Sequence, residues 1–149
     1  MKVALASDHG GFELKEIIKK YLEKELNAEV MDFGTNSNEA VDYPDFAFLV
    51  ACAVADKQVD RGIMIDGVGV ASAMVANKLQ GIRAAVCNDL FSANSSRAHN
   101  NANVLTMGAR IIGCGLAKEI VKVFLNTEFE ARHQGRIDKI TRIERSVKL

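Results

Sequence analysis

The strongest chemical signal in the sequence is an aspartate at the start of a glycine turn. Asp66 follows the apolar residues 63–65 and opens a G-x-G turn at 67–69. Glycines there let backbone N–H groups approach an anion, so residues 67–72 are expected to bind a phosphate, a carboxylate or an enediolate. A nucleotide-binding turn is a second interpretation, although Ser72 stands where a dinucleotide fingerprint has glycine.

The position of Asp66 itself permits two interpretations. A carboxylate pushed toward low dielectric behind an apolar strand would be a stronger base, suited to removing a proton from carbon. Alternatively, the carboxylate accepts hydrogen bonds from the N–H groups of its own turn and has a structural role. The spacing alone does not choose between them.

Two histidines stand beside groups that could share their chemistry. His9 follows Asp8 after the first apolar run, whereas His99 is followed by Asn100 and a second asparagine. A histidine titrates near neutrality and suits acid or base work beside neutral amide donors. The plain alternatives are a helix cap for Asp8, a surface position for His9 and an ordinary helix end at His99.

Three arginines could hold a phosphate, because the planar guanidinium group matches phosphate oxygens. Arg110 lies in a G-A-R segment, and Arg132 and Arg136 are spaced to share one face of a helix. Surface arginines at that spacing are common and are often only solvated, so the alternative of a plain solvated face stays open.

Short apolar runs alternate with amphipathic stretches, a pattern that predicts a parallel sheet covered by helices. In such a fold the ligand lies outside the carboxyl ends of the strands, where the turns described above begin. Pro44, the only proline, suits the first turn of a helix. The predicted strands are 3–6, 28–33, 62–65, 82–86 and 103–107, and the predicted helices are 12–26, 44–55, 71–79, 90–99 and 116–125.

Composition narrows the function class. A length of 149 residues with 48% hydrophobic content suits one domain over residues 1–149. Basic and acidic residues both number 19, so neither a nucleic-acid nor a membrane surface is expected.

The first apolar run is too short for a signal peptide, which favours a cytoplasmic protein. Cys52, Cys87 and Cys114 are odd in number and widely spaced, as expected of reduced thiols.

The end of the chain differs from the rest. From Glu128 onward it becomes polar and basic, with isoleucines interleaved among arginines and lysines. A last helix here is expected to reach beyond the compact body onto a partner chain.

Longer motifs carry a family resemblance. They are S-D-H-G-G-F at 7–12, V-D-Y-P-D at 41–45, R-A-H-N-N-A-N-V-L at 97–105, G-A-R-I-I-G at 108–113 and R-H-Q-G-R at 132–136. The chain resembles the ribose-5-phosphate isomerase B and galactose-6-phosphate isomerase family. The resemblance implies an α/β Rossmann-like three-layer αβα sandwich with a five-stranded parallel sheet. It also implies cofactor-free and metal-free interconversion of a phosphorylated aldose and ketose, such as ribose 5-phosphate and ribulose 5-phosphate of the pentose phosphate pathway.

The resemblance further implies a homodimer or tetramer whose subunits share their active sites. His99 would open the sugar ring with Asp8 nearby, and Asn100 with the N–H groups of 67–72 would hold the enediolate. Tyr43 would line the sugar pocket, and His9 with the three arginines would lie at the phosphate. The expected catalytic residues are Asp66, His99 and Asn100, and the expected substrate-binding residues are Asp8, His9, Tyr43, Gly67, Val68, Gly69, Val70, Ala71, Ser72, Arg110, Arg132 and Arg136.

Three positions of the central turn depart from the family pattern. Asp66 stands where the family usually has cysteine, Val68 where it has threonine or another polar residue, and Ala71 where it has glycine. A positioned carboxylate can move a proton beside a carbonyl, as one does in triosephosphate isomerase, so Asp66 is predicted to be the base. The alternative is a non-catalytic sugar-phosphate-binding or partner subunit.

Overall fold

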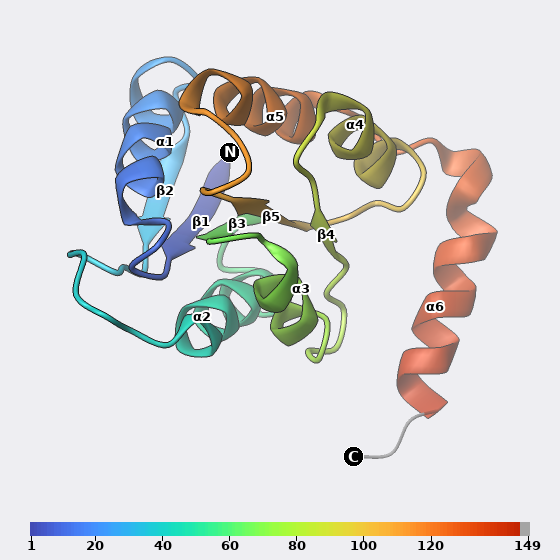
Figure 1. Cartoon of the computed structure of the whole chain (residues 1–149). Helices are drawn as coiled ribbons and strands as arrows, with labels where there is room; N and C mark the ends of the chain where they lie inside the picture. Colours follow the sequence, from blue (N-terminus) through green and yellow to red (C-terminus); the bar gives the residue numbers. More distant parts are fainter. Residues whose placement is uncertain (147–149) are drawn as a thin grey trace.

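A parallel sheet of five strands forms the centre of the computed structural model, which describes residues 1–146 (Figure 1). The strand order is β2-β1-β3-β5-β4. The strands are β1 (Lys2–Ser7), β2 (Glu29–Asp32), β3 (Arg61–Asp66), β4 (Ala84–Val86) and β5 (Val104–Gly108). The helices are α1 (Phe12–Lys24), α2 (Tyr43–Ala55), α3 (Val70–Ala76), α4 (Leu90–Ala98), α5 (Cys114–Asn126) and α6 (Gln134–Ser146), with a 3-10 turn η1 (Ala131–His133) before α6.

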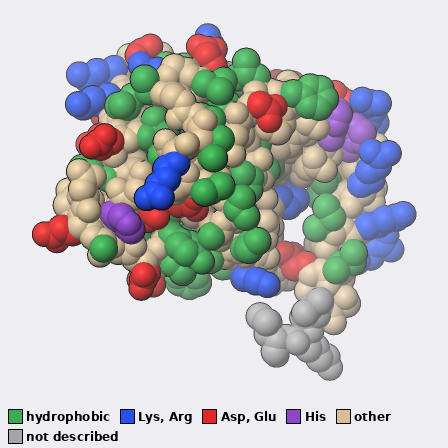
Figure 2. Space-filling model, viewed as in Figure 1, with side chains coloured by type: hydrophobic (Ala, Val, Ile, Leu, Met, Phe, Trp, Pro, Cys, Tyr) green, Lys and Arg blue, Asp and Glu red, His purple; other side chains and the backbone are tan. Residues whose placement is uncertain are grey.

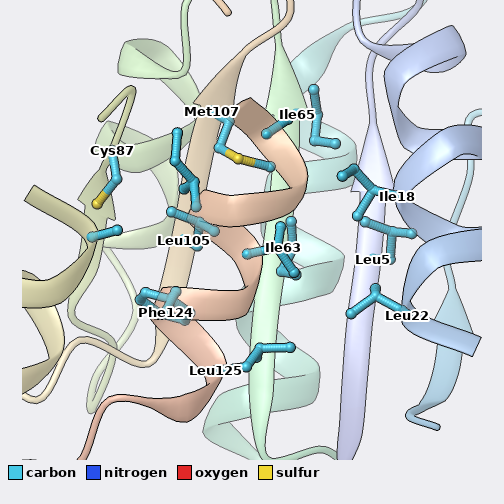
Figure 3. Close-up of a cluster of buried hydrophobic side chains, with 14 of the residues drawn as sticks. Leu5, Ile18, Leu22, Ile63, Ile65, Cys87, Leu105, Met107, Phe124 and Leu125 are labelled. Carbon is cyan, nitrogen blue, oxygen red and sulfur yellow. The ribbon is translucent and has the colours of Figure 1, made fainter. Parts of the chain in front are cut away.

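Helices cover both faces of this sheet, which confirms the predicted three-layer sandwich. Alternate residues of β3 enter different cores: Ile63 packs with α1 and α5, whereas Met64 packs with α2 on the opposite face. Because both faces are covered, the central strands consist of continuous apolar runs. Figure 3 shows the first of these cores, in which Leu5, Ile63 and Leu105 of three neighbouring strands meet the side chains of α1 and α5.

The region between α3 and β4 differs most from prediction. The helix ends at Ala76 and the strand begins at Ala84, whereas the sequence predicted 71–79 and 82–86. The side chain of Asn77 explains both differences: its Nδ2 donates to the carbonyl of Ala84 at 2.9 Å, and its Oδ1 accepts from the N–H of Ala84 at 2.8 Å. This pair of hydrogen bonds ends α3 and fixes where β4 starts.

The chain reverses its winding direction between β1 and β3. The helix after β1 packs on one face of the sheet and the helix after β3 packs on the other. A crevice forms where neighbouring crossovers leave in opposite directions, outside the carboxyl ends of the strands. Asp8 follows β1 and Asp66 ends β3, so the fold places both carboxylates at this crevice.

The last helix, α6, stands away from the sheet and its covering helices (Figure 1). Ile137 near its start is buried, but the side chain of Ile143 is 65% exposed. One link to the main body is the Glu144 carboxylate, which accepts a hydrogen bond of 2.7 Å from the N–H of Gly81. The predicted tail helix is therefore confirmed over the described residues, and its contact with a partner stays a prediction. Within residues 1–146 no helix combines the length and apolarity that crossing a membrane requires.

A buried lysine fixes the loop that follows β2. Lys15 on α1 has no exposed surface, and its Nζ lies 2.9 and 3.0 Å from the two carboxylate oxygens of Asp32. Asp32 also accepts hydrogen bonds from Lys19 and from the N–H of Gly34. Burial works to raise the pKa of Asp32, but these hydrogen bonds outweigh it and hold that pKa below its ordinary value.

We expect Lys15→Met to lower the free energy of unfolding by about 3 kcal/mol or more, because it removes one partner of a buried ion pair. The matched control is Lys19→Met, which removes the half-exposed partner of the same carboxylate and should cost about 1 kcal/mol or less. Urea unfolding at one fixed protein concentration measures both. The contribution of Lys15 should be present above about pH 4 and should disappear as the pH falls through the lowered pKa of Asp32. Equal losses in the two variants would contradict this ranking.

Candidate active site

The turns after β1 and β3 are packed tightly against each other. A side chain at Gly11 would place its Cβ 2.3 Å from the carbonyl oxygen of Ile65, so only glycine fits there. Gly69 has a φ of +85°, and a Cβ at this position would lie 3.0 Å from the backbone carbonyl carbon of Met107. Gly11 thus sets the turn after β1 against β3, Gly69 sets the turn after β3 against β5, and the carboxylates of Asp8 and Asp66 share one pocket.

The Asp66 carboxylate is buried and accepts four hydrogen bonds from its own turn. Its Oδ1 accepts from the N–H groups of Val68, at 2.8 Å, and Gly69. Its Oδ2 accepts from the N–H of Ser72, at 3.2 Å, and from the hydroxyl of Ser72. This is the arrangement described by the hydrogen-bonding interpretation of the sequence. It holds the carboxylate rigidly in the crevice, where its side chain is 5% exposed.

The hydrogen bonds to Asp66 divide the donors of the 67–72 turn. Three backbone N–H groups, those of Val68, Gly69 and Ser72, point at the carboxylate. The N–H groups of Gly67, Val70 and Ala71 donate to no protein acceptor in the described part of the chain. The sequence predicted that the whole turn would bind an enediolate, but only the N–H groups of Gly67, Val70 and Ala71 are available for that role.

Asp8 lies across the crevice from Asp66. Burial raises the pKa of Asp8 above its ordinary value; the N–H of Gly11, which donates to Oδ1 at 3.0 Å, opposes that rise, and the negative charge of Asp66 adds to it. Asp8 is thus more ready than a surface aspartate to carry a proton. The two carboxylates therefore suit different roles, because Asp66 is fixed by four hydrogen-bond donors whereas Asp8 is held by fewer.

A pocket of about 370 Å³ opens onto both carboxylates, a size within the range of small-molecule sites. Its walls are mainly apolar and include Val68, Val70 and Met74. The side chain of Arg110 lies over Gly67, 3.6 Å from the position that a Cβ would take there. His9 uses Nδ1 to contact the backbone of Val41. The predicted residues that gather here are Asp8, His9, Tyr43, Asp66, Gly67, Val68, Gly69, Val70, Ala71, Ser72 and Arg110.

The other predicted residues form a second cluster around the end of α4. His99 caps this helix and contacts the Ser95 hydroxyl through Nδ1 at 3.2 Å, and its ring centroid lies 4.6 Å from that of His133. Arg136 donates to His133 at 3.1 Å, and Arg132 pairs with Glu130 at 2.6 Å.

Charge and solvation in this second cluster differ from those of the first. Burial, followed by the positive charges of Arg132, His99 and Arg136, holds the pKa of His133 below its ordinary value. The adjacent Asn100 is exposed, and Asn101 takes the left-handed conformation with a φ of 48°, which is typical of an ordinary helix end. The cluster therefore offers a cationic, partly solvated face suited to an anion.

The two clusters lie at opposite edges of the sheet. Helix α4 starts at the carboxyl edge, where Asn88 accepts from the N–H of Gly108, and runs back to the amino edge, where Asn101 accepts from Arg83. The residues of β5 between these edges advance about 13 Å at roughly 3.3 Å per residue. Figure 2 likewise shows histidine side chains at two separated places on one face of the molecule. The predicted site is therefore two half-sites within one chain.

The second half-site also contains groups with metal-ligand chemistry. His99, Glu130 and His133 offer ligand atoms that all lie within 4.8 Å of one another. The guanidinium of Arg132 already binds Glu130, and two arginines flank the group, which opposes the binding of a cation.

Sequence reasoning missed Glu130 and His133. His133 lies in the R-H-Q-G-R motif and Glu130 stands two residues before that motif, but no spacing rule connects either residue with His99. Their contacts depend on the segment after α5 returning to α4, where the N–H of Glu130 donates to the carbonyl of Ala98 at 2.9 Å.

Comparisons with a family model, with other sequences and with solved structures all find the same family. Residues 3–140 match the ribose/galactose isomerase family. The chain is 49% identical to ribose-5-phosphate isomerase B of Escherichia coli over 144 residues, covering 96% of each protein. It superposes on Clostridium thermocellum ribose-5-phosphate isomerase B with a TM-score of 0.94 and 49% identity, covering 97% of this chain and 98% of that one. The Mycoplasma genitalium enzyme with bound ribulose 5-phosphate gives a TM-score of 0.92 at 44% identity, covering 98% of this chain and 97% of that one.

The proximity of the two carboxylates generates a titration test. Asp66→Asn should lower the pKa of Asp8, because it removes a negative charge that disfavours ionisation of Asp8. Carbon-13 NMR of the aspartate carboxyl groups measures the shift, and Asp32, on the far side of β1, should titrate as in the parent. An unchanged or raised pKa of Asp8 would show that the two groups do not interact.

Proposed function

This chain belongs to the ribose/galactose isomerase family, and we propose that it interconverts a phosphorylated aldose and ketose as an isomerase of the ribose-5-phosphate isomerase B type. One observation carries the proposal: each half-site pairs candidate catalytic groups with candidate phosphate-binding groups. Asp8 and Asp66 lie with His9 and Arg110, and His99 lies with Arg132 and Arg136.

The chemistry follows from the groups at each half-site. His99 opens the sugar ring as acid or base, with Asp8 as its partner across the site. Asp66 then removes the proton from C2 of the aldose and returns it to C1, and the electron pair forms an enediolate in between. The available N–H groups of Gly67, Val70 and Ala71, with the amide of Asn100, balance the enediolate charge. The reaction needs no oxidant, because C1 is reduced as C2 is oxidised: one proton moves from C2 to C1 and a second moves from the C2 hydroxyl to the C1 oxygen.

Two copies of the chain complete one active site in this proposal. Exposed apolar side chains follow three neighbouring strands at the carboxyl edge: Val68 and Val70 after β3, Phe91 after β4 and Ile111 after β5. Phe91 is 82% exposed, and apolar surface of this kind marks a contact with another protein. The apolar side of α6, with exposed Ile140 and Ile143, would extend the contact. A twofold arrangement would then bring the His99 cluster of one copy to the Asp66 pocket of the other.

The substrate we propose is ribose 5-phosphate or a related pentose or hexose phosphate, which would place the protein in cytoplasmic carbohydrate metabolism. A nucleotide-binding function is less well supported, because three N–H groups of the 67–72 turn already donate hydrogen bonds to Asp66 and are not available to a phosphate. A non-catalytic partner subunit is the second candidate, because Val68 stands where the family usually has threonine or another polar residue, and Ala71 adds a methyl group where the family usually has glycine.

The base assignment predicts that binding and chemistry separate in Asp66→Asn. Substrate affinity should survive, while kcat should fall by on the order of a hundredfold or more. In the parent, kcat should decline at acidic pH as the base becomes protonated, and in Asp66→Cys this limb should move up toward the thiol range near pH 8.5. The assay uses a panel of four- to six-carbon aldose and ketose phosphates. Parental kcat in Asp66→Asn would reject the base, and a parent that binds but converts none of the panel would favour the partner subunit.

The phosphate assignment predicts a loss of binding in Arg136→Ala. Losing a charge-assisted hydrogen bond to phosphate should cost roughly 1.5–3 kcal/mol of affinity. Arg142→Ala is the matched control, since it removes the same charge from the same helix outside the proposed site. Isothermal titration with the converted sugar phosphate gives both affinities. Equal affinities in the two variants would remove Arg136 from the phosphate site.

The shared-site arrangement predicts an oligomer. Sedimentation velocity at micromolar concentration should show dimers or tetramers and no monomer, because a monomer would leave both half-sites incomplete. A monomer that isomerises its substrate at the parental rate would contradict this.

A further inference from the structure

Ser72 makes a contact to the carboxylate of Asp66 that differs in kind from the others. It is the third residue of α3 and has no exposed surface. Both its N–H, at 3.2 Å, and its hydroxyl donate to the same oxygen of Asp66, Oδ2. The remaining two donors, the N–H groups of Val68 and Gly69, reach only Oδ1. Ser72 therefore controls one oxygen of the carboxylate by itself.

The hydroxyl of Ser72 is also the one partner of Asp66 that can reverse its role. A backbone N–H can only donate, whereas a hydroxyl can donate or accept. No donor within residues 1–146 reaches the Ser72 oxygen, so its lone pairs are open. Protonation of Asp66 removes one of its four acceptor positions, so four donors would then face three acceptor positions. The three backbone N–H groups cannot move away, and only the Ser72 hydroxyl can turn aside.

We propose that Ser72 is a positioning residue for the base: its hydroxyl donates to the Asp66 carboxylate and turns away, as an acceptor, while Asp66 holds the proton. This inference rests on the proposed role of Asp66. The C2–H bond breaks, its electron pair stays on the sugar as the enediolate, and the proton resides on Asp66 until a new C1–H bond forms. Ser72 exchanges no atom with the substrate.

The fold provides a place for the turned hydroxyl. A serine in a helix can donate to the carbonyl three or four residues earlier, which here belongs to Gly69 or Val68. The carbonyl of Gly69 accepts only a long hydrogen bond, 3.4 Å, from the N–H of Ala73. It therefore retains capacity for a second donor, and the rotation of one χ1 angle would connect the two states.

Ser72→Ala tests this role in the full-length protein. We expect kcat to fall about tenfold with KM changed less than about threefold, because the base loses orientation and not its contact with substrate. The acidic limb of kcat should move to higher pH, since one donor to the ionised carboxylate is gone. Ser72→Thr keeps the hydroxyl and should restore both. Ser96→Ala is the control, because Ser96 is a buried helix serine whose hydroxyl donates to the carbonyl of Ala93.

A double-mutant cycle separates this inference from the base assignment. In the Asp66→Asn background, Ser72→Ala should leave the residual kcat unchanged, because the group that Ser72 positions is already disabled. If Asp66→Asn is impaired and Ser72→Ala still multiplies the loss, or if the single variant leaves the acidic limb in place, the positioning role is wrong while the base stands. If Asp66→Asn keeps the parental kcat, the base assignment and the role of Ser72 fail together. Circular dichroism checks that each variant is folded.

Discussion

The direction of α4 is the constraint from which the rest of this molecule follows. In a parallel sheet each helix must run back along the strands, so α4, which starts after β4 at the same edge of the sheet as Asp66, ends at the opposite edge. His99 stands at that end, separated from Asp66 by about the length of β5. A site that needs both groups must therefore draw on another chain, and the exposed apolar side chains after β3, β4 and β5 supply a surface for that contact.

The carboxylate at position 66 reorganises the turn around it. A carboxylate carries four lone-pair directions, and the turn fills them with three N–H groups and one hydroxyl. A thiolate in the same place would leave more of these donors for the substrate. The negative charge of Asp66 also acts on Asp8, which shifts the proton affinity of the second acid in the crevice. The exchange of cysteine for aspartate is thus a change in the whole hydrogen-bond pattern of the pocket.

Much of the fold follows from local pattern, because the sheet is buried on both faces and its strands are continuous apolar runs between amphipathic helices. The limits of α3 and β4 did not follow, since the side chain of Asn77 sets them through contacts with Ala84. Two interpretations of Asp66 fitted the sequence equally, because only the path of the 67–72 turn decides which donors reach it. The burial of Lys15 can be predicted from the sequence, because Lys15 shares a helix face with Ile18 and Leu22 on the apolar stripe of α1. The division into half-sites depends on topology, which residue spacing does not contain.

The central claim, that Asp66 of one copy works with His99 of another, can be tested by complementation. Chains with Asp66→Asn and chains with His99→Asn, carrying different affinity tags, are co-expressed, and the mixed dimer is isolated through both tags. One of its two sites then combines an intact Asp66 with an intact His99, so its activity should be about half that of the parent dimer, while each variant alone is nearly inactive. A mixed dimer no more active than the two variants alone would show that each site lies within a single chain.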